Sequence, residues 1–214
     1  MSRLIDTGLE QLATTIFRMG ELAYKTVSLS LSGYIENKNA YANVLDFSDM
    51  LLSLAYEAED KAFELIARYQ PVASDLRVLK SYMKIAYDFE RFGRYALDVS
   101  QVHKRLGGLD ECEDWMEKSI GEMSEKVLSM VLTSVTSLKN HDANLARTLS
   151  KTENQVDEAY FGYLDSLVER APATSKCTIS SVLVVRYLER IADHATYIGE
   201  SIVYLVAGEK VSLR

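Results

Sequence analysis

The sequence predicts an all-α fold, a tandem repeat of two long antiparallel three-helix bundles related by a pseudo-twofold axis. Only two prolines and ten glycines interrupt the 214 residues, and alternating runs of β-branched residues are scarce. Apolar residues instead recur every three or four positions over long stretches, which is the period of an amphipathic helix. A third observation, an internal repeat, divides the chain into two similar halves.

The repeat is clearest in two segments, residues 89–96 and 188–196. Both carry a glutamate followed by an arginine, and their apolar residues and an alanine also recur. One acidic residue is not repeated, because Arg94 stands where the later segment has Asp193. The sequence therefore predicts a duplicated helical unit in which one acidic pair is kept and the other is lost.

The first half is expected to hold three helices, over about residues 3–36, 40–69 and 71–106. The first of them carries an apolar stripe: Leu12, Ile16, Met19, Ala23, Val27 and Leu31. Residues 37–39 form the first turn. Pro71 must end the second helix or begin the third, because a proline inside a helix costs about 3 kcal/mol.

The double glycine at residues 107–108 is the predicted boundary between a first bundle, residues 1–107, and a second bundle, residues 108–214. The second half repeats the plan, with helices expected over about residues 110–139, 143–169 and 176–206.

Breaks between helices also correspond in the two halves. Pro172 falls before the last helix, as Pro71 falls before the third, and Thr174 and Ser175 are good N-cap residues. Each helix is near 30 residues, or roughly 45 Å long. Helices of this length joined by short turns run antiparallel to their neighbours.

Charge and composition narrow the class of protein. The formal net charge of −7 argues against nucleic acid as an electrostatic partner. Cys112 and Cys177 fit no ligand spacing and suggest no disulfide framework, which favours a reducing cytoplasm. The N-terminus lacks the apolar core of a signal peptide, and no run of about 20 apolar residues could span a membrane. We therefore expect a cytoplasmic protein.

Two acidic pairs are candidates for a metal site. Glu189 and Asp193 are four residues apart on the last helix, and Glu153 and Asp157 are four apart on the helix before it. These helices are expected to be antiparallel neighbours with the pairs at similar heights. Four carboxylates at one place repel unless a cation neutralises them or some become protonated. Carboxylate oxygens suit hard cations such as Mg²⁺, Ca²⁺, Mn²⁺ or iron.

A plain solvated helix face explains such pairs equally well. The apolar stripe of the last helix consists of Leu188, Ile191, Ala195, Ile198 and Ile202. At about 100° per residue, Glu189 and Asp193 point some 150° away from the centre of that stripe. This excludes a catalytic centre walled by the core, and it leaves a solvated face or a metal site on the outside. The neighbouring His194 points elsewhere, so we expect a surface residue or a support for the ligands.

The corresponding positions of the first half lack most of the carboxylates. Ser48 and Leu52 stand approximately where the second half has Glu153 and Asp157, and Glu90 keeps its charge beside Arg94. We expect the guanidinium of Arg94 to occupy the place of a metal, which leaves one competent site instead of two.

Two signatures resemble those of the PhoU family. The segment Tyr-Gln-Pro-Val-Ala-Ser-Asp-Leu-Arg at residues 69–77, with Lys-Ile at 84–85 and Glu-Arg-Phe-Gly at 90–93, is similar to the signature of its first repeat. The segment Leu-Glu-Arg-Ile-Ala-Asp-His-Ala at 188–195 resembles that of its second repeat. The resemblance covers essentially the whole chain.

The resemblance implies two three-helix bundles with surface E/D-x-x-x-D motifs that hold metal. In that family the motifs bind iron, zinc or other cations in mono- or multinuclear clusters. The motif carries over to four residues of this chain: Glu153, Asp157, Glu189 and Asp193. It does not carry over to Ser48, Leu52 or Arg94. The expected cofactor is a divalent or trivalent ion (iron, zinc, manganese or magnesium), and carboxylates alone do not identify it.

The resemblance also implies a function. Members of the family are non-catalytic cytoplasmic regulators that couple the phosphate ABC transporter to a sensor kinase and repress uptake when phosphate is plentiful. Many are dimers, and they reach the membrane only through their partners. A homodimer that binds no nucleic acid is expected here.

The sequence bears on two other classes of protein. Ferritin-like di-iron enzymes need Glu-x-x-His pairs facing into one bundle. The residues three before the histidines are Ser100, Leu138 and Ile191, so this class is excluded. A helical scaffold without a functional metal site remains the alternative.

Overall fold

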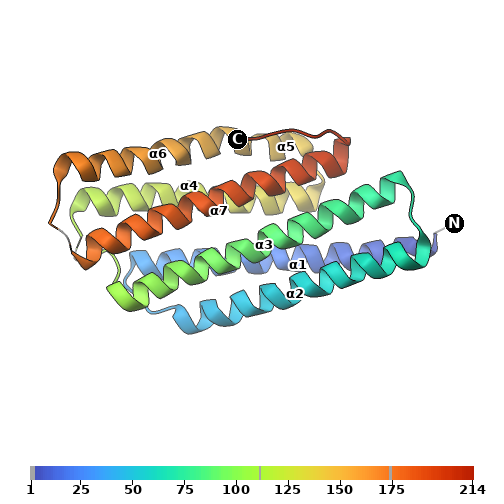
Figure 1. Cartoon of the computed structure of the whole chain (residues 1–214), viewed down its shortest axis with the longest axis horizontal. Helices are drawn as coiled ribbons and strands as arrows, with labels where there is room; N and C mark the ends of the chain where they lie inside the picture. The colour runs from blue at the N-terminus through green and yellow to red at the C-terminus, as the bar shows by residue number, and fades with distance from the viewer. Residues whose placement is uncertain (1–2, 111, 174) are drawn as a thin grey trace.

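The computed structural model describes residues 3–110, 112–173 and 175–214, and it confirms an all-α fold (Figure 1). The helices are α1 (Leu4–Ile35), α2 (Tyr41–Tyr69), α3 (Ala73–Leu106), α4 (Asp114–Asn140), α5 (Ala143–Arg147), α6 (Leu149–Arg170) and α7 (Lys176–Ala207). The expected helix bounds agree with these to within a few residues, with one exception.

That exception is the fifth expected helix, which is interrupted at Thr148 and so forms α5 and α6. The hydroxyl of Thr148 donates to the carbonyl of Leu145 at 2.7 Å. Such side-chain bonds to the preceding turn compete with the helical hydrogen bonds. The helix also begins with a well-formed cap, since Asp142 accepts hydrogen bonds from two backbone amides. The prediction of one continuous helix was therefore wrong by a single break.

The breaks before the two prolines have the same local structure in both halves. Gln70 caps the C-terminus of α2 and Ala171 caps that of α6, and both residues have left-handed backbone geometry, with φ of 44° and 42°. Pro71 and Pro172 follow directly, where neither can continue the helix. The repeat detected in the sequence thus extends to the way the chain turns.

The start of α7 is held by a side-chain cap and by a disulfide. The hydroxyl of Ser175 accepts a hydrogen bond from the amide of Thr178 at 3.1 Å, as its N-cap role predicts, whereas Thr174 lies outside the described residues. Cys177, in the first turn of α7, is bonded to Cys112 in the connection from α3 to α4. The expectation of no disulfide was wrong, because the fold joins two cysteines that are far apart in sequence. The cysteines therefore give no support to a reducing compartment.

The two halves share one continuous core. Helices α1–α3 form the first half and α4–α7 the second, and α3 and α7 lie side by side along the seam between them (Figure 1). Helix α1 also packs against α4. The whole predicted stripe of α1 is buried in the core. Within the described residues, no helix is both long and apolar enough to cross a membrane.

Candidate metal centre

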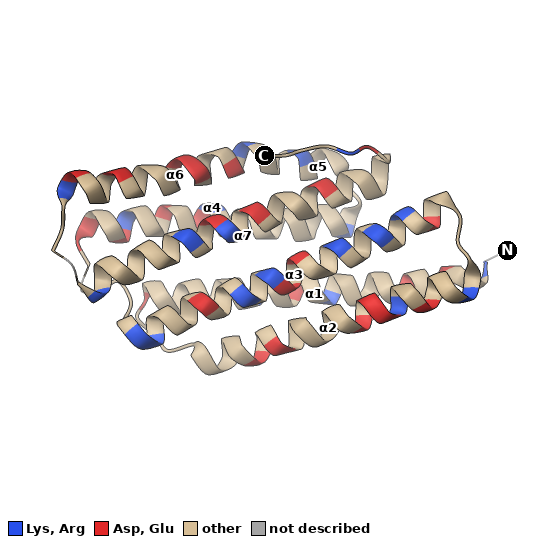
Figure 2. Cartoon of the chain, viewed as in Figure 1, with Lys and Arg blue, Asp and Glu red and all other residues tan. Residues whose placement is uncertain are grey.

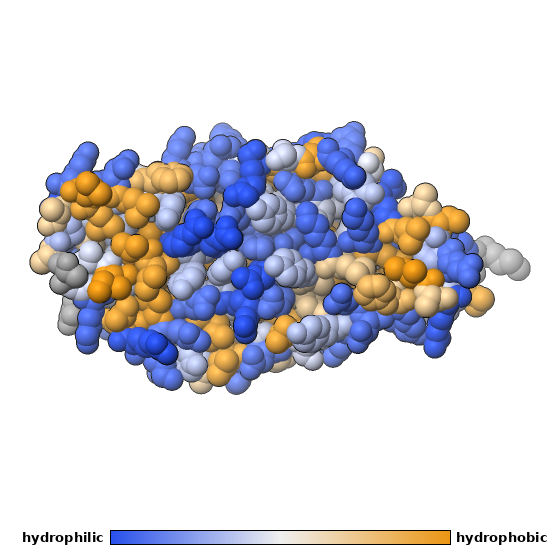
Figure 3. Space-filling model, viewed as in Figure 1, coloured by the Kyte–Doolittle hydropathy of each residue, from blue (hydrophilic) through white to orange (hydrophobic). Residues whose placement is uncertain are grey.

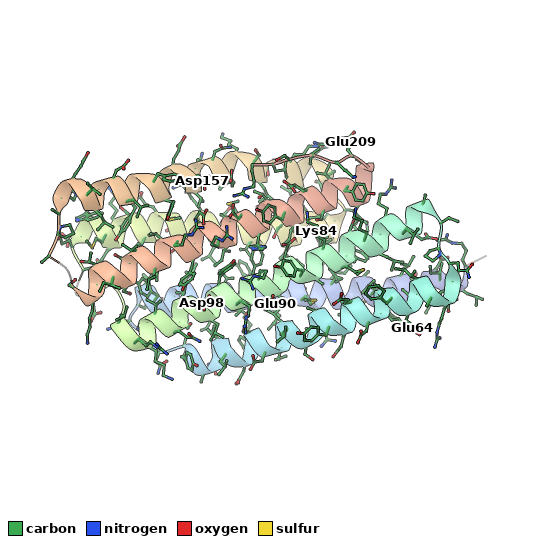
Figure 4. All side chains as sticks on the ribbon, viewed as in Figure 1. Glu64, Lys84, Glu90, Asp98, Asp157 and Glu209 are labelled. Atoms are coloured by element: carbon green, nitrogen blue, oxygen red, sulfur yellow. A yellow bond between two sulfur atoms is a disulfide. The ribbon has the colours of Figure 1, made fainter. Side chains whose placement is uncertain are left out.

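The structure brings the two acidic pairs together. Glu153 and Asp157 lie on α6, Glu189 and Asp193 lie on α7, and the two helices are packed neighbours. Figure 4 shows Asp157 on α6, across from α7. We call these four residues the acidic cluster.

The carboxylates of the acidic cluster repel one another. Burial raises the pKa of Glu153, and the charges of Asp157, Asp193 and Glu189 raise it further. Burial likewise raises the pKa of Glu189 and of Asp157, with Asp193 as the next cause in both cases. Arginine side chains oppose these shifts. An added cation would relieve the remaining repulsion.

The cluster is more buried than the helical angles predicted. Glu153 is 3%, Glu189 8% and Asp193 1% exposed, while Asp157 is half-buried. The expected outward direction was therefore wrong for Glu189 and Asp193. The angle was measured from one apolar stripe, but α7 packs against α3, α4, α5 and α6 and so has little free surface.

Arginines of α7 neutralise part of this charge. Arg186 Nη1 lies 2.7 Å from Glu189 Oε2, and Arg190 Nη1 lies 3.0 Å from Asp193 Oδ2. Both pairs are three residues apart on the helix. Glu189 and Asp193 are thus each paired with an arginine of their own helix.

A third arginine reaches the cluster from residues 208–214, which fold back along α7. Leu213 is buried, and its amide donates to Glu200 Oε1 at 3.1 Å. The next residue, Arg214, places Nη2 2.8 Å from Asp193 Oδ1 and Nε 4.0 Å from Glu153 Oε1. Its guanidinium therefore stands between α6 and α7, where the sequence predicts a metal ion.

The donor atoms suit a hard cation. Asp193 Oδ1 is buried, and although Arg214 is close, no hydrogen bond to this oxygen has acceptable geometry. Among the described residues, no three Asp, Glu, His or Cys side chains converge as they would around a metal ion. Carboxylate oxygens are thus the donor type that a hard cation prefers, but the side chains have the positions of an arginine-paired state.

The equivalent region of the first half contains one carboxylate. Ser48 is buried, and its hydroxyl has no hydrogen-bond partner among the residues that the structure describes. Arg94 Nε lies 3.6 Å from Glu90 Oε1. Burial raises the pKa of Glu90, and Arg91 and Arg94 lower it, with no carboxylate adding to the shift. Figure 4 shows Glu90 and Asp98 on α3. Arg94 is thus paired with the remaining glutamate, as expected.

Sequence reasoning missed a buried pair at the seam. His194 Nδ1 lies 2.8 Å from Asp88 Oδ1, and the rings of Tyr95 and Tyr197 lie 5.6 and 5.4 Å from the imidazole. Burial raises the pKa of Asp88, and the hydrogen bond with His194 opposes this shift. His194 is not on the surface, because its position on α7 faces α3. One feature of the sequence could have indicated this pair: Asp88 directly precedes the first repeated segment, residues 89–96, and His194 lies within the second, residues 188–196.

Both halves of the chain match one known protein family. The model of the PhoU domain matches the chain twice, over residues 16–102 and 120–202. The chain belongs to the PhoU family. The two matches fall in the two halves, as the internal repeat predicts.

Relatives of the PhoU family match over almost their full length. A phosphate-specific transport system accessory protein PhoU homolog of Clostridium acetobutylicum is 31% identical over 99% of this chain and 98% of its own. The crystal structure of PhoU from Pseudomonas aeruginosa is 28% identical, with a TM-score of 0.89 over 96% of this chain and 100% of that one. The phosphate transport system regulatory protein PhoU from Streptococcus pneumoniae gives a TM-score of 0.85 at 23% identity, over 97% and 99% of the two chains.

The family assignment decides the class of function. This PhoU protein is an accessory regulator of phosphate-specific transport and not an enzyme.

Proposed function

We propose that this PhoU protein is a metal-binding regulator that represses phosphate uptake when phosphate is plentiful. It acts by contact with components of the phosphate ABC transporter, with a sensor kinase, or with both. The observation that carries the metal assignment is the acidic cluster of α6 and α7, in which burial and then the neighbouring carboxylates raise the pKa values of Glu153, Asp157 and Glu189.

The proposed ligands are Glu153, Asp157, Glu189 and Asp193. A bound divalent or trivalent ion (iron, zinc, manganese or magnesium) would supply positive charge that offsets the repulsion among them. The burial of three of these ligands would reduce competition from water. We place the protein in the cytoplasm as a homodimer, attached to the membrane only through its partner.

Exposed apolar surface supports action by protein contact. The groove between α2 and α3 encloses about 860 Å³ and is lined mostly by apolar side chains, among them Leu52, Ala55, Tyr56, Met83 and Tyr87. Figure 3 shows apolar residues gathered toward both ends of the face that carries α3 and α7. Large exposed apolar surfaces of this kind mark sites of protein interaction.

Elemental analysis tests the metal assignment. Purified wild-type protein and the double variant Glu189→Ala/Asp193→Ala are dialysed against a weak chelator and measured side by side. We expect metal in the wild type and near-zero metal in the variant. The matched control is Glu90→Ala/Arg94→Ala, which changes the equivalent positions of the first half and should retain the metal.

The alternative is a helical scaffold without a functional metal site. The pairing of Arg186, Arg190 and Arg214 with the cluster favours it, because these arginines already neutralise much of the charge. Equal, near-zero metal in the wild type and the double variant would support the scaffold.

A further inference from the structure

A small pocket lies away from the acidic cluster, between α3, α7 and the segment that follows α7. It encloses about 240 Å³ and is lined by Lys80, Ser81, Lys84, Glu200, Ser201, Tyr204, Lys210 and Val211. Figure 2 shows several basic residues along the first half of α3, beside α7, and Figure 4 labels Lys84 there. We call it the α3–α7 pocket.

The pocket is rich in positive charge in a chain whose net charge is −7. Lys80, Lys84 and Lys210 come from two separate parts of the chain and meet at its wall. Arg77 lies one turn before Lys80, with its guanidinium against Gly208. In the described part of the chain, Arg77, Lys80 and Lys210 have no carboxylate partner within ion-pair distance.

The single carboxylate in the wall is already engaged. Glu200 Oε1 accepts a hydrogen bond from the amide of Leu213 at 3.1 Å. Its other oxygen, Oε2, lies 3.9 Å from Lys84 Nζ. Glu200 therefore holds the chain segment in place and offsets one lysine, which leaves an excess of positive charge.

A buried hydroxyl in the wall lacks a partner. Ser81 is 2% exposed, and its Oγ makes no hydrogen bond within the described residues. A buried polar group without a partner costs free energy, so native structures usually provide one. Ser81 lines the same pocket as Lys80, Lys84 and Lys210.

We propose that the α3–α7 pocket binds a phosphate-like oxyanion, with Lys80, Lys84 and Lys210 as charged donors and Ser81 as a neutral donor. Ammonium groups bind phosphate oxygens through strong charge-assisted hydrogen bonds. Pockets for drug-sized ligands enclose about 300–1,000 Å³, so this volume suits a small ion or a small phosphomonoester. The site uses none of the proposed metal ligands and does not depend on a bound metal.

Isothermal titration calorimetry of the metal-free full chain tests this site. One arm titrates inorganic phosphate and a second arm titrates phosphoserine, which distinguishes the free ion from a phosphoryl group on a larger molecule. Lys80→Gln/Lys84→Gln should weaken binding about tenfold or more, because two charged donors are lost. Lys118→Gln/Lys126→Gln removes the same charge on α4 and should leave the affinity within about twofold of the wild type.

The variant Ser81→Ala separates binding from folding. Without ligand it should be at least as stable as the wild type, since it removes a hydroxyl that has no partner. The rise in melting temperature on adding phosphate should be smaller than in the wild type.

Binding of phosphate or of phosphoserine that depends on Lys80 and Lys84 supports the site, and the arm that binds more tightly identifies the source of the oxyanion. Three results would overturn the proposal: no binding in either arm, equal losses in the pocket and control variants, or loss of binding in Glu189→Ala/Asp193→Ala. The last result would place the anion at the acidic cluster instead.

Discussion

The two halves of this PhoU protein place a buried glutamate on the last helix of each half but surround it with different charges. Glu90 in α3 has Arg94 one turn later, whereas Glu189 in α7 has Asp193 at that position and Asp157 on the facing helix. The backbone plan is the same, so the difference lies in a few side chains. A duplicated fold can thus keep its packing in both copies while only one copy keeps a cluster of carboxylates.

The largest difference that we expect between the halves concerns stability. The disulfide between Cys112 and Cys177 encloses most of the second half, with a sequence separation of 65, and the described part of the first half has no counterpart. Cys112→Ser/Cys177→Ser should lower the free energy of unfolding by about 4 kcal/mol, mainly through the entropy of the unfolded chain.

Chemical denaturation measures this change, and hydrogen exchange locates it. Amides of α4 and α6 should exchange faster in the variant, while those of α2 change little. Equal loss of protection in both halves would show that the disulfide stabilises the shared core as one unit.

An intermediate effect is expected from the arginines that stand in the two equivalent regions. Arg214→Ala removes the guanidinium beside Asp193 and Glu153, so metal affinity at the acidic cluster should rise about tenfold, or 1.4 kcal/mol. Arg94→Ala is the matched change in the first half and should create no site, because Ser48 and Leu52 offer no carboxylate.

Competition with a fluorescent metal indicator gives both affinities. Unchanged affinity in Arg214→Ala would mean that this guanidinium does not compete with the metal. A new site in Arg94→Ala would mean that a single glutamate is sufficient for one.

The smallest expected effect is a difference in pH dependence. In metal-free protein the pKa values of Glu153, Asp157 and Glu189 are raised by burial and by neighbouring carboxylates. The folded state then holds protons more tightly than the unfolded state, so stability falls as the pH rises through these raised values.

Melting temperatures in chelator should therefore increase as the pH is lowered from neutral towards the ordinary titration range of carboxylates, by a margin that Glu153→Gln/Glu189→Gln reduces. Glu90→Gln should reduce it less, since only burial raises the pKa of Glu90. An equal reduction by Glu90→Gln would contradict the role of repulsion within the acidic cluster.

Most of the fold could be predicted from the sequence, because helical period and turn residues are local signals. The buried stripe of α1 and the break before Pro172 illustrate this. The break at Thr148 is an exception that the apolar period does not reveal. The apolar pattern thus predicts where a helix lies, but it does not predict a short break within that helix.

The acidic cluster could be predicted in its members but not in its surroundings. Spacing and antiparallel packing were sufficient to bring Glu153 near Asp193. The burial of Glu189 and Asp193 could not be predicted, because it depends on how many helices pack against α7. The approach of Arg214 depends on a segment outside any helix, and the pairing of Asp88 with His194 depends on the seam between the halves.

The disulfide has a consequence for motion between the repeats. The connection from α3 to α4 would be the natural hinge, but Cys112 ties it to α7, and Ser180 on the same helix donates to Gly107 O at 3.2 Å. Gly108 lies so close to the Tyr34 carbonyl of α1 that an added Cβ would be only 2.5 Å from it. A hinge fixed on both sides cannot swing the halves apart. A signal that passes between the repeats would therefore travel through the packed contacts of α3 with α7 and of α1 with α4, as a shift of helices that stay packed together.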